Sequence, residues 1–232
     1  MSIRRTRASA PVILRRMDKD GTLIPPSQFI PQYEARSVLT HVDFHVLHMA
    51  LGAVRTLRDN GVDLCMAINF SRSTLLTPDF IARVLSACEQ YGVPPSGIML
   101  EVTETLATID RDRLSELLHS IQKAGLRLSL DDFGSKYSNT SILTDIAFDE
   151  VKLDKTLVND ICRSERARII LRNLLQMCSE LGDVPVVAEG IENEEQATLL
   201  KDYACSRGQG FCFYRPMALN EFTNLLIDTP HT

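Results

Sequence analysis

The sequence predicts an α/β fold built as a closed barrel of TIM type, and three observations support this. Short apolar runs, often β-branched, alternate with longer amphipathic runs along the chain, which is typical of a parallel sheet covered by helices on both faces. The alternation repeats at short spacing, which favours a closed barrel over an open doubly wound sheet. Nearly every apolar run also ends in a polar residue, and the carboxyl ends of barrel strands converge on one mouth.

The apolar runs are the expected strands: 11–15, 64–70, 97–103, 126–131, 150–154, 184–189 and 209–214. Helical patterns cover 38–59, 78–91, 109–124, 139–146, 164–181, 193–203 and 219–227. Thr77-Pro78-Asp79 is typical of a helix start with proline in the first turn, and Gly125 follows the 109–124 pattern as a stop signal. No linker or repeat divides the sequence, so we expect one barrel domain over 11–232.

Composition and charge exclude several classes of function. Hydrophobic residues make up 44% and charged residues 24%, and the formal net charge is −5. This charge disfavours a DNA or RNA polymer as partner, although a small anionic ligand can bind in a metal-loaded pocket. No run approaches the roughly 20 apolar residues of a membrane helix, and the basic N-terminus lacks the apolar stretch of a signal peptide. We therefore expect a cytoplasmic protein.

The six cysteines have no metal-site spacing and are expected to be small buried hydrophobes.

Four carboxylates, an amide and a lysine lie at or next to the ends of the expected strands: Asn69, Glu101, Asp131, Asp132, Lys152 and Glu189. Gln209 starts the last expected strand. Bare carboxylates gathered at one barrel mouth would repel and raise one another's pKa, and divalent cations resolve that conflict. Oxygen ligands without His or Cys indicate Mg²⁺, Mn²⁺ or Ca²⁺. The adjacent Asp131-Asp132 pair could bridge two ions ~4 Å apart, which would activate a water and hold phosphate oxygens.

Lys152 fits the same chemistry, because an ammonium group could orient the attacking water or neutralise charge on a phosphorane-like transition state. The set therefore predicts a metal site for a phosphodiester. Structural roles stay open for single members of the set, since one strand-end carboxylate is often a helix cap or a surface ion pair. Glu104 fits a cap or a loop anchor, and Asp154 could pair with Lys152 or Lys155.

Several segments, in the right order along the chain, resemble the EAL domain, a bacterial family that hydrolyses cyclic di-GMP to the linear dinucleotide pGpG. They are DGTLIPPSQFIP at 20–31, INFS at 68–71, LEVTET at 100–105, LDDFGSKYSN at 130–139, VKLDKTLV at 151–158, VVAEGIENEEQ at 186–196 and GQGFCFYRP at 208–216. The resemblance spans residues 11 to about 225. It implies a modified TIM barrel, usually dimeric, that binds cyclic di-GMP.

The resemblance also implies roles for single residues. The implied metal positions are Asn69, Glu101, Asp131, Asp132 and Glu189, which would hold Mg²⁺ or Mn²⁺ as one or two ions. The implied catalytic residues are Lys152, which would hold the catalytic water, Glu189, Glu104 as anchor of the DDFG loop, and Asp154. Arg15 and Gln209 are the implied ligand-binding residues.

Three features depart from the family pattern. Pro11 stands where the family's name-giving glutamate ligates a metal, and Lys136 stands where active members have a glycine. Residues 1–10, MSIRRTRASA, form a segment that does not resemble the family's first strand. We therefore expect either a barrel without that strand or a chain that begins inside a longer or disrupted gene.

Three hypotheses of function follow. A metal-dependent cyclic di-GMP phosphodiesterase explains the retained metal positions and Lys152. A non-enzymatic receptor for cyclic di-GMP, or a protein-interaction module, explains Pro11 and the altered loop, because loss of one oxygen ligand weakens metal binding. An unrelated barrel enzyme with Lys152 as a Schiff-base lysine is disfavoured, because the surrounding carboxylates would keep that lysine protonated.

Overall fold

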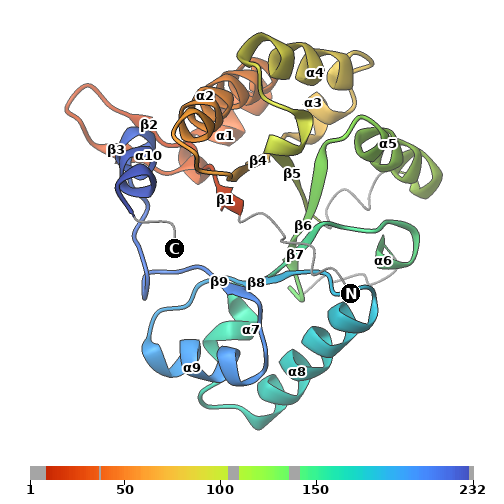
Figure 1. The fold of residues 1–232 in the computed structure, drawn as a ribbon, viewed down its shortest axis with the longest axis vertical. Coiled ribbons are helices and arrows are strands. Elements are labelled where there is room, and N and C mark those ends of the chain that lie inside the picture. The colour runs from red at the N-terminus through yellow and green to blue at the C-terminus, as the bar shows by residue number, and fades with distance from the viewer. Residues whose placement is uncertain (1–8, 37, 104–109, 136–141, 230–232) are drawn as a thin grey trace. The chain divides into compact units, whose positions relative to one another are not determined.

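The computed structural model describes residues 9–36, 38–103, 110–135 and 142–229 (Figure 1). The chain divides into two compact units. The first unit comprises Met1–Leu100, Lys123–Arg127 and Met217–Thr232, and the second comprises Glu101–Gln122 and Leu128–Pro216.

The first unit contains a short parallel sheet and most of the longer helices of the N-terminal half. Its hydrogen-bonded strand order is β1 (Ser9–Pro11), β4 (Cys65–Asn69) and the start of β5 (Ile98–Thr103). Strand β1 pairs in parallel with β4, with Pro11 opposite Ala67. An antiparallel hairpin follows β1 and consists of β2 (Arg16–Met17) and β3 (Leu23–Ile24). The helices are α1 (Pro26–Ala35), α2 (Leu39–Asp59), α3 (Arg72–Leu75), α4 (Phe80–Tyr91), the 3₁₀ turn η1 (Pro95–Gly97) and α10 (Leu219–Asp228).

Helix α2 carries the core of the first unit, because its apolar residues recur at helical spacing. Leu47 and Leu51 are fully buried on the same side of the helix, and α2 packs against α4, β4 and α10 (Figure 1). Phe44 of α2 joins an aromatic cluster with Phe70 and Phe80, with ring centroids 5.1–6.4 Å apart. These contacts bury the helical stripe that the sequence pattern predicts.

The second unit is built from parallel strands joined by helices. Its strand order is the end of β5, then β6 (Arg127–Phe133), β7 (Glu150–Leu153), β8 (Val186–Ala188) and β9 (Arg207–Gly208). Strands β6 to β9 pair in parallel. The helices are α5 (Arg111–Lys123), α6 (Ile142–Asp145), α7 (Lys155–Asn159), α8 (Glu165–Glu180) and α9 (Glu194–Asp202), of which α7, α8 and α9 lie together beside β8 and β9 (Figure 1).

The strands of the second unit separate apolar and polar side chains by face. In β7 the fully buried Val151 and Leu153 alternate with Glu150 and Lys152, which are 1% and 5% exposed. The same alternation occurs in β6. Successive side chains of a strand point to opposite faces, so one face of these strands is apolar and the other carries buried polar groups. The polar face holds the candidate site.

Most expected elements are present with ends shifted by a few residues, but the expected strand over 209–214 is wrong. Pairing with β8 involves Arg207–Gly208, and residues 211–213 form a turn. The aromatic residues of this run lie at the surface: Phe211, Phe213 and Tyr214 are 59%, 49% and 66% exposed. The apolar run is therefore not a buried strand. The hairpin β2–β3, the helices α1, α3 and α7 and the 3₁₀ turn η1 were not expected.

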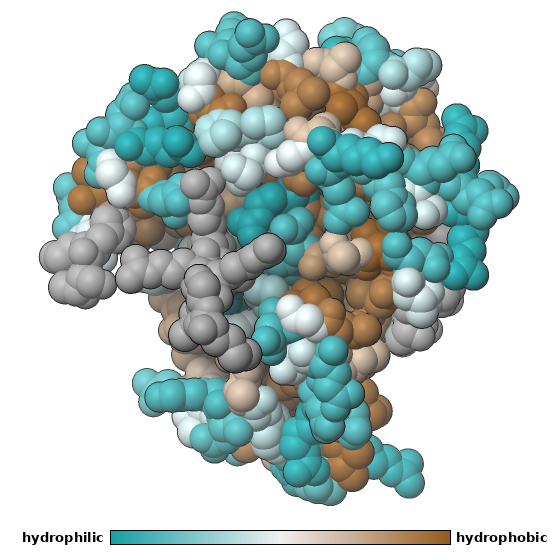
Figure 2. Space-filling model, turned by 45° about the vertical axis from the view of Figure 1, so that its right-hand side comes forward, coloured by the Kyte–Doolittle hydropathy of each residue, from teal (hydrophilic) through white to brown (hydrophobic). Residues whose placement is uncertain are grey.

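Hydrophilic residues cover much of the face drawn in Figure 2, with smaller hydrophobic areas between them. No helix among the described residues has the length and apolarity that a bilayer crossing requires.

The cysteines are free thiols, and burial raises the pKa of Cys88 and of Cys178 to about 11. Both thiols are therefore packed as small hydrophobes, as the sequence predicts.

Candidate functional site

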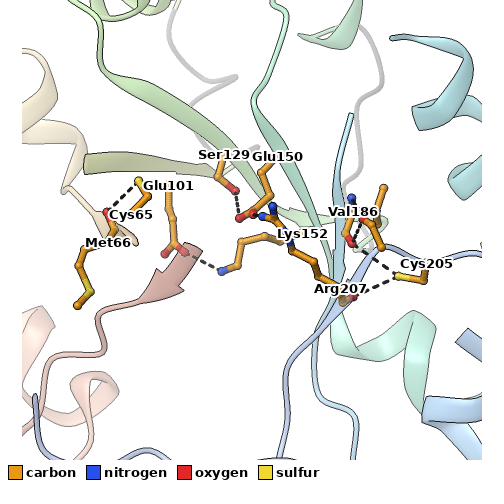
Figure 3. A network of polar contacts seen from close by, with 10 residues as sticks. Cys65, Met66, Glu101, Ser129, Glu150, Lys152, Val186, Cys205 and Arg207 are labelled. Carbon is orange, nitrogen blue, oxygen red and sulfur yellow. Dashed lines mark hydrogen bonds and ion pairs between the residues drawn. The ribbon is translucent and has the colours of Figure 1, made fainter. Parts of the chain in front are cut away.

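Lys152 is the centre of a buried charge cluster in the second unit. Its Nζ lies 2.9 Å from Oε1 of Glu101, 2.9 Å from Oδ1 of Asp131 and 2.7 Å from Oε1 of Glu189. Figure 3 shows the side chain extending from β7 toward Glu101. Burial lowers the pKa of Lys152, but the three carboxylates raise it by more, so the net pKa lies above its usual value. The lysine is therefore a cation held among acids.

The carboxylates outnumber this cation. Burial raises the pKa of Glu101 to about 7, and the nearby charges of Asp131 and Glu189 contribute to the rise while Lys152 opposes it. Burial is also the main cause of the raised pKa values of Glu189 and Asp132. One ammonium group therefore does not balance four neighbouring carboxylates, and the cluster favours additional positive charge.

A β-bulge brings two consecutive aspartates to one side of β6. Between Leu130 and Phe133, three steps along β6 lie opposite two steps along β7. Asp132 takes up the extra residue with φ 57°, in the left-handed region that Asp adopts more readily than most residues. A regular strand would point the neighbours Asp131 and Asp132 to opposite faces. With the bulge, one oxygen from each of them and one from Glu189 lie within 4.8 Å of one another.

Asp131, Asp132 and Glu189 have the donor chemistry of a site for a hard divalent cation. All three ligands are carboxylate oxygens, which Mg²⁺, Mn²⁺ and Ca²⁺ prefer. Burial and nearby negative charge raise the pKa of Asp132, and a bound cation would favour its charged form. The three residues therefore fit a divalent cation.

Hydrogen bonds to neighbouring groups orient Glu189 and Gln209. The Glu189 backbone N–H donates to the Leu153 carbonyl at 3.1 Å, and the Gln209 N–H donates to the Ala188 carbonyl at 2.9 Å. Gln209 Nε2 also donates to Oε1 of Glu189 at 2.7 Å. Lys152 binds the same oxygen, so two donors fix the carboxylate of Glu189.

Asp154 caps a helix, whereas the sequence suggested an ion pair with Lys152 or Lys155 as its structural role. It is the N-cap of α7, and its side chain accepts a hydrogen bond from the Thr156 backbone N–H at 2.9 Å. Its negative charge also contributes to the raised pKa of Asp132. Asp154 therefore lies close enough to Asp132 to raise the pKa of that carboxyl group.

The other predicted site residues lie in the first unit or outside the described residues. Asn69 ends β4, and Arg15 is exposed after β1. Pro11 is the last residue of β1 and lies opposite Ala67, so it shares a face with Asn69 two residues further along β4. Glu104 and Lys136 lie outside the described residues.

A second group of buried polar residues was missed by the sequence interpretation. Arg207 Nη1 donates to Oε2 of Glu150 at 2.7 Å, and Ser129 Oγ donates to Oε1 of Glu150 at 3.4 Å (Figure 3). The signal that could have found the pair is the two-residue spacing, because Glu150 precedes Lys152 and Arg207 precedes Gln209 by two positions. Such spacing places Glu150 on the same face as Lys152, and Arg207 on the same face as Gln209.

Comparison with known proteins gives consistent matches over this chain. Residues 1–216 match the family model described as EAL domain. The signaling protein YkoW of Bacillus subtilis is 31% identical over 221 residues, covering 95% of this chain and 28% of that protein. The cyclic di-GMP phosphodiesterase NbdA of Pseudomonas aeruginosa is 34% identical over 204 residues, covering 86% of this chain and 26% of that protein. The chain thus spans less than a third of the length of these two curated relatives.

Among solved structures, the PaMucR phosphodiesterase in complex with c-di-GMP superposes with a TM-score of 0.85 at 29% identity. The match covers 91% of this chain and 86% of that chain. It confirms the α/β fold of modified TIM-barrel type that the sequence predicts.

Proposed function

The chain belongs to the EAL domain family, and from this we propose that it is a metal-dependent phosphodiesterase that hydrolyses cyclic di-GMP to pGpG. The observation that carries the proposal is the convergence of oxygens from Asp131, Asp132 and Glu189 within 4.8 Å, with Lys152 bound to two of these side chains. The name of NbdA and the c-di-GMP complex of PaMucR support the choice of substrate.

The reaction adds one water to one phosphodiester. The water oxygen forms a bond to phosphorus, the bond from phosphorus to the ribose 3′ oxygen breaks, and a proton passes to that leaving oxygen. Mg²⁺ or Mn²⁺, as one or two ions, would polarise the phosphate and lower the pKa of a bound water. We propose that Asp131, Asp132 and Glu189 hold the cation. By family resemblance alone, we assign Glu101 and Asn69 as further ligands.

The other polar residues would position the reactants. The Lys152 ammonium group would orient the attacking water and stabilise negative charge that develops around phosphorus. Gln209 keeps Glu189 in place through the 2.7 Å hydrogen bond. We assign a phosphate contact to Arg15, a supporting place at the edge of the site to Asp154, and the role of loop anchor to Glu104, all by family resemblance.

We further propose that the protein is a cytoplasmic homodimer. The family resemblance supports the dimer, and the free cysteines suit a reducing compartment. Light scattering on the purified chain tests the assembly, because a dimer has twice the 26.0 kDa mass of the chain.

A product assay tests the enzymatic proposal. Purified protein, Mn²⁺ or Mg²⁺ and cyclic di-GMP should yield pGpG on chromatography, and chelator should abolish the product. We expect Glu189→Ala and Lys152→Ala each to lower turnover at least about a hundredfold, because each removes a group at the reacting centre. Arg168→Ala is the matched control, since Arg168 pairs with Glu165 on α8 and should keep wild-type turnover. Unchanged turnover in Glu189→Ala would contradict the proposal.

A catalytically inactive receptor, or a protein-interaction module, is the second candidate, and Pro11 favours it because its side chain has no donor oxygen. Pro11→Glu would place a carboxylate at the end of β1 on the face that Asn69 shares. A receptor should bind cyclic di-GMP in the presence of chelator without product. If the wild type is inert and Pro11→Glu restores cleavage, the missing ligand explains the loss.

A further inference from the structure

The second unit contains a buried ion pair that the proposed mechanism does not use. Glu150 is 1% exposed and lies 2.7 Å from Nη1 of Arg207, whose side chain is 21% exposed. Ser129 donates to the other carboxylate oxygen of Glu150 at 3.4 Å (Figure 3). A buried carboxylate is costly without such compensation, so the two charges depend on each other.

The ion pair joins two strands that are not neighbours. Glu150 lies on β7 and Arg207 on β9, with β8 between them. Lys152 lies opposite Val187, and Val187 lies opposite Arg207, so in these parallel strands the three side chains point to one face. The pair therefore crosses β8 on the polar face and links β7 directly to β9.

Each member of the pair precedes a site residue by two positions on the same face. Glu150 precedes Lys152 on β7, and Arg207 precedes Gln209 at the end of β9. Lys152 and Gln209 both donate to Oε1 of Glu189, each at 2.7 Å. A change in the separation of β7 and β9 would therefore move two donors relative to one carboxylate oxygen.

We propose that Glu150 and Arg207 form a positioning pair that sets Lys152 and Gln209 around the carboxylate of Glu189. The guanidinium group suits this role because it is planar, always charged and rigid. This inference rests on the proposed function, because it concerns the same Glu189. The pair acts on the geometry of that carboxylate, so its effect on Mn²⁺ affinity can be measured without turnover.

The test compares Arg207→Gln and Glu150→Gln with wild type in three measurements: Mn²⁺ affinity by calorimetry, kcat with KM for cyclic di-GMP, and Tm. All binding and rates are measured well below the lowest Tm. We expect each variant to bind Mn²⁺ about tenfold more weakly, as is usual when groups that orient a metal ligand are lost. We expect kcat to fall by a similar factor with KM nearly unchanged. Arg207→Lys, which keeps the positive charge, should recover part of the affinity.

Arg168→Gln is the matched control, because it removes the same charge from an ion pair on α8 of the same unit and should leave Mn²⁺ affinity unchanged. If Arg207→Gln and Glu150→Gln lower Tm but keep wild-type Mn²⁺ affinity and kcat, the pair is structural only and the proposal is overturned. If Arg207→Gln does not fold, Glu150→Gln decides, because it removes the negative charge of the pair and leaves Arg207 in place. A wild type that binds Mn²⁺ but does not cleave refutes the proposed function alone, because Mn²⁺ affinity still tests the pair. A wild type that binds no Mn²⁺ overturns both.

Discussion

Lys152 directs its ammonium group at three different carboxylates, which matches its three donors. This arrangement keeps a cation buried, but it leaves the acids in excess. Glu101 shows the result most clearly, because it is 3% exposed and burial raises its pKa to about 7. Glu101 therefore binds a proton more tightly in the folded chain than in the unfolded chain.

The raised pKa of Glu101 predicts a pH dependence of stability in the metal-free protein. Because the folded pKa lies above the unfolded one, the stabilising contribution is complete below pH 4.5 and is lost as pH rises through about 7. The shift corresponds to a loss on the order of 3 kcal/mol. Urea unfolding in chelator across this window should show a steeper decline for wild type than for Glu101→Gln. Parallel declines would contradict the assignment.

At the scale of elements, Gly210 fixes the end of β9 against the segment that follows β8. A Cβ on Gly210 would lie 2.1 Å from the carbonyl oxygen of Ile191 and 2.4 Å from its nitrogen. Ile191 is held there by its own backbone, since its N–H donates to the Gln209 carbonyl and its carbonyl accepts from the Cys212 N–H. The contact therefore cannot relax without breaking those hydrogen bonds.

We expect Gly210→Ala to lower the free energy of unfolding by at least about 2 kcal/mol, because backbone atoms must move to admit the methyl group. Gly182→Ala is the control from the same unit. Gly182 also has a positive φ, of 116°, but a Cβ there meets nothing within 4 Å, so it should lose only about 1 kcal/mol. Thermal melting followed by circular dichroism compares the two, and equal losses would show that the contact with Ile191 is unimportant.

The strand-end residues were predictable because apolar runs and the polar residues that end them are both local signals. Asp131, Lys152 and Glu189 converge as that pattern predicts. The bulge was not predictable, because an Asp-Asp sequence fits a regular strand equally well and only the pairing with β7 shows the extra residue. The two-residue spacing places Glu150 on the face of Lys152, but Glu150 and Arg207 lie 57 positions apart, so the sequence does not show that these two residues pair. The 209–214 run failed because burial depends on tertiary contacts.

For the molecule as a whole, bound cation should be linked to folding. Asp131, Asp132 and Glu189 all belong to the second unit, and the unfolded chain does not hold them together. We expect Mn²⁺ at a hundred times its Kd to stabilise the protein by about 2.7 kcal/mol. Differential scanning fluorimetry should show this rise in Tm for wild type and Arg168→Ala. Glu189→Ala should not respond, and an equal rise in that variant would place the ion elsewhere.

The bulge in β6 also bears on how such a site can be lost. A chain one residue shorter between Leu130 and Phe133 would restore the regular ladder with β7 and remove a residue from the left-handed region. Only one aspartate would then face Glu189. Loss of a single codon would thus relieve backbone strain and abolish the carboxylate pair in one step. The carboxylate pair therefore depends on the one extra residue that the bulge inserts into β6.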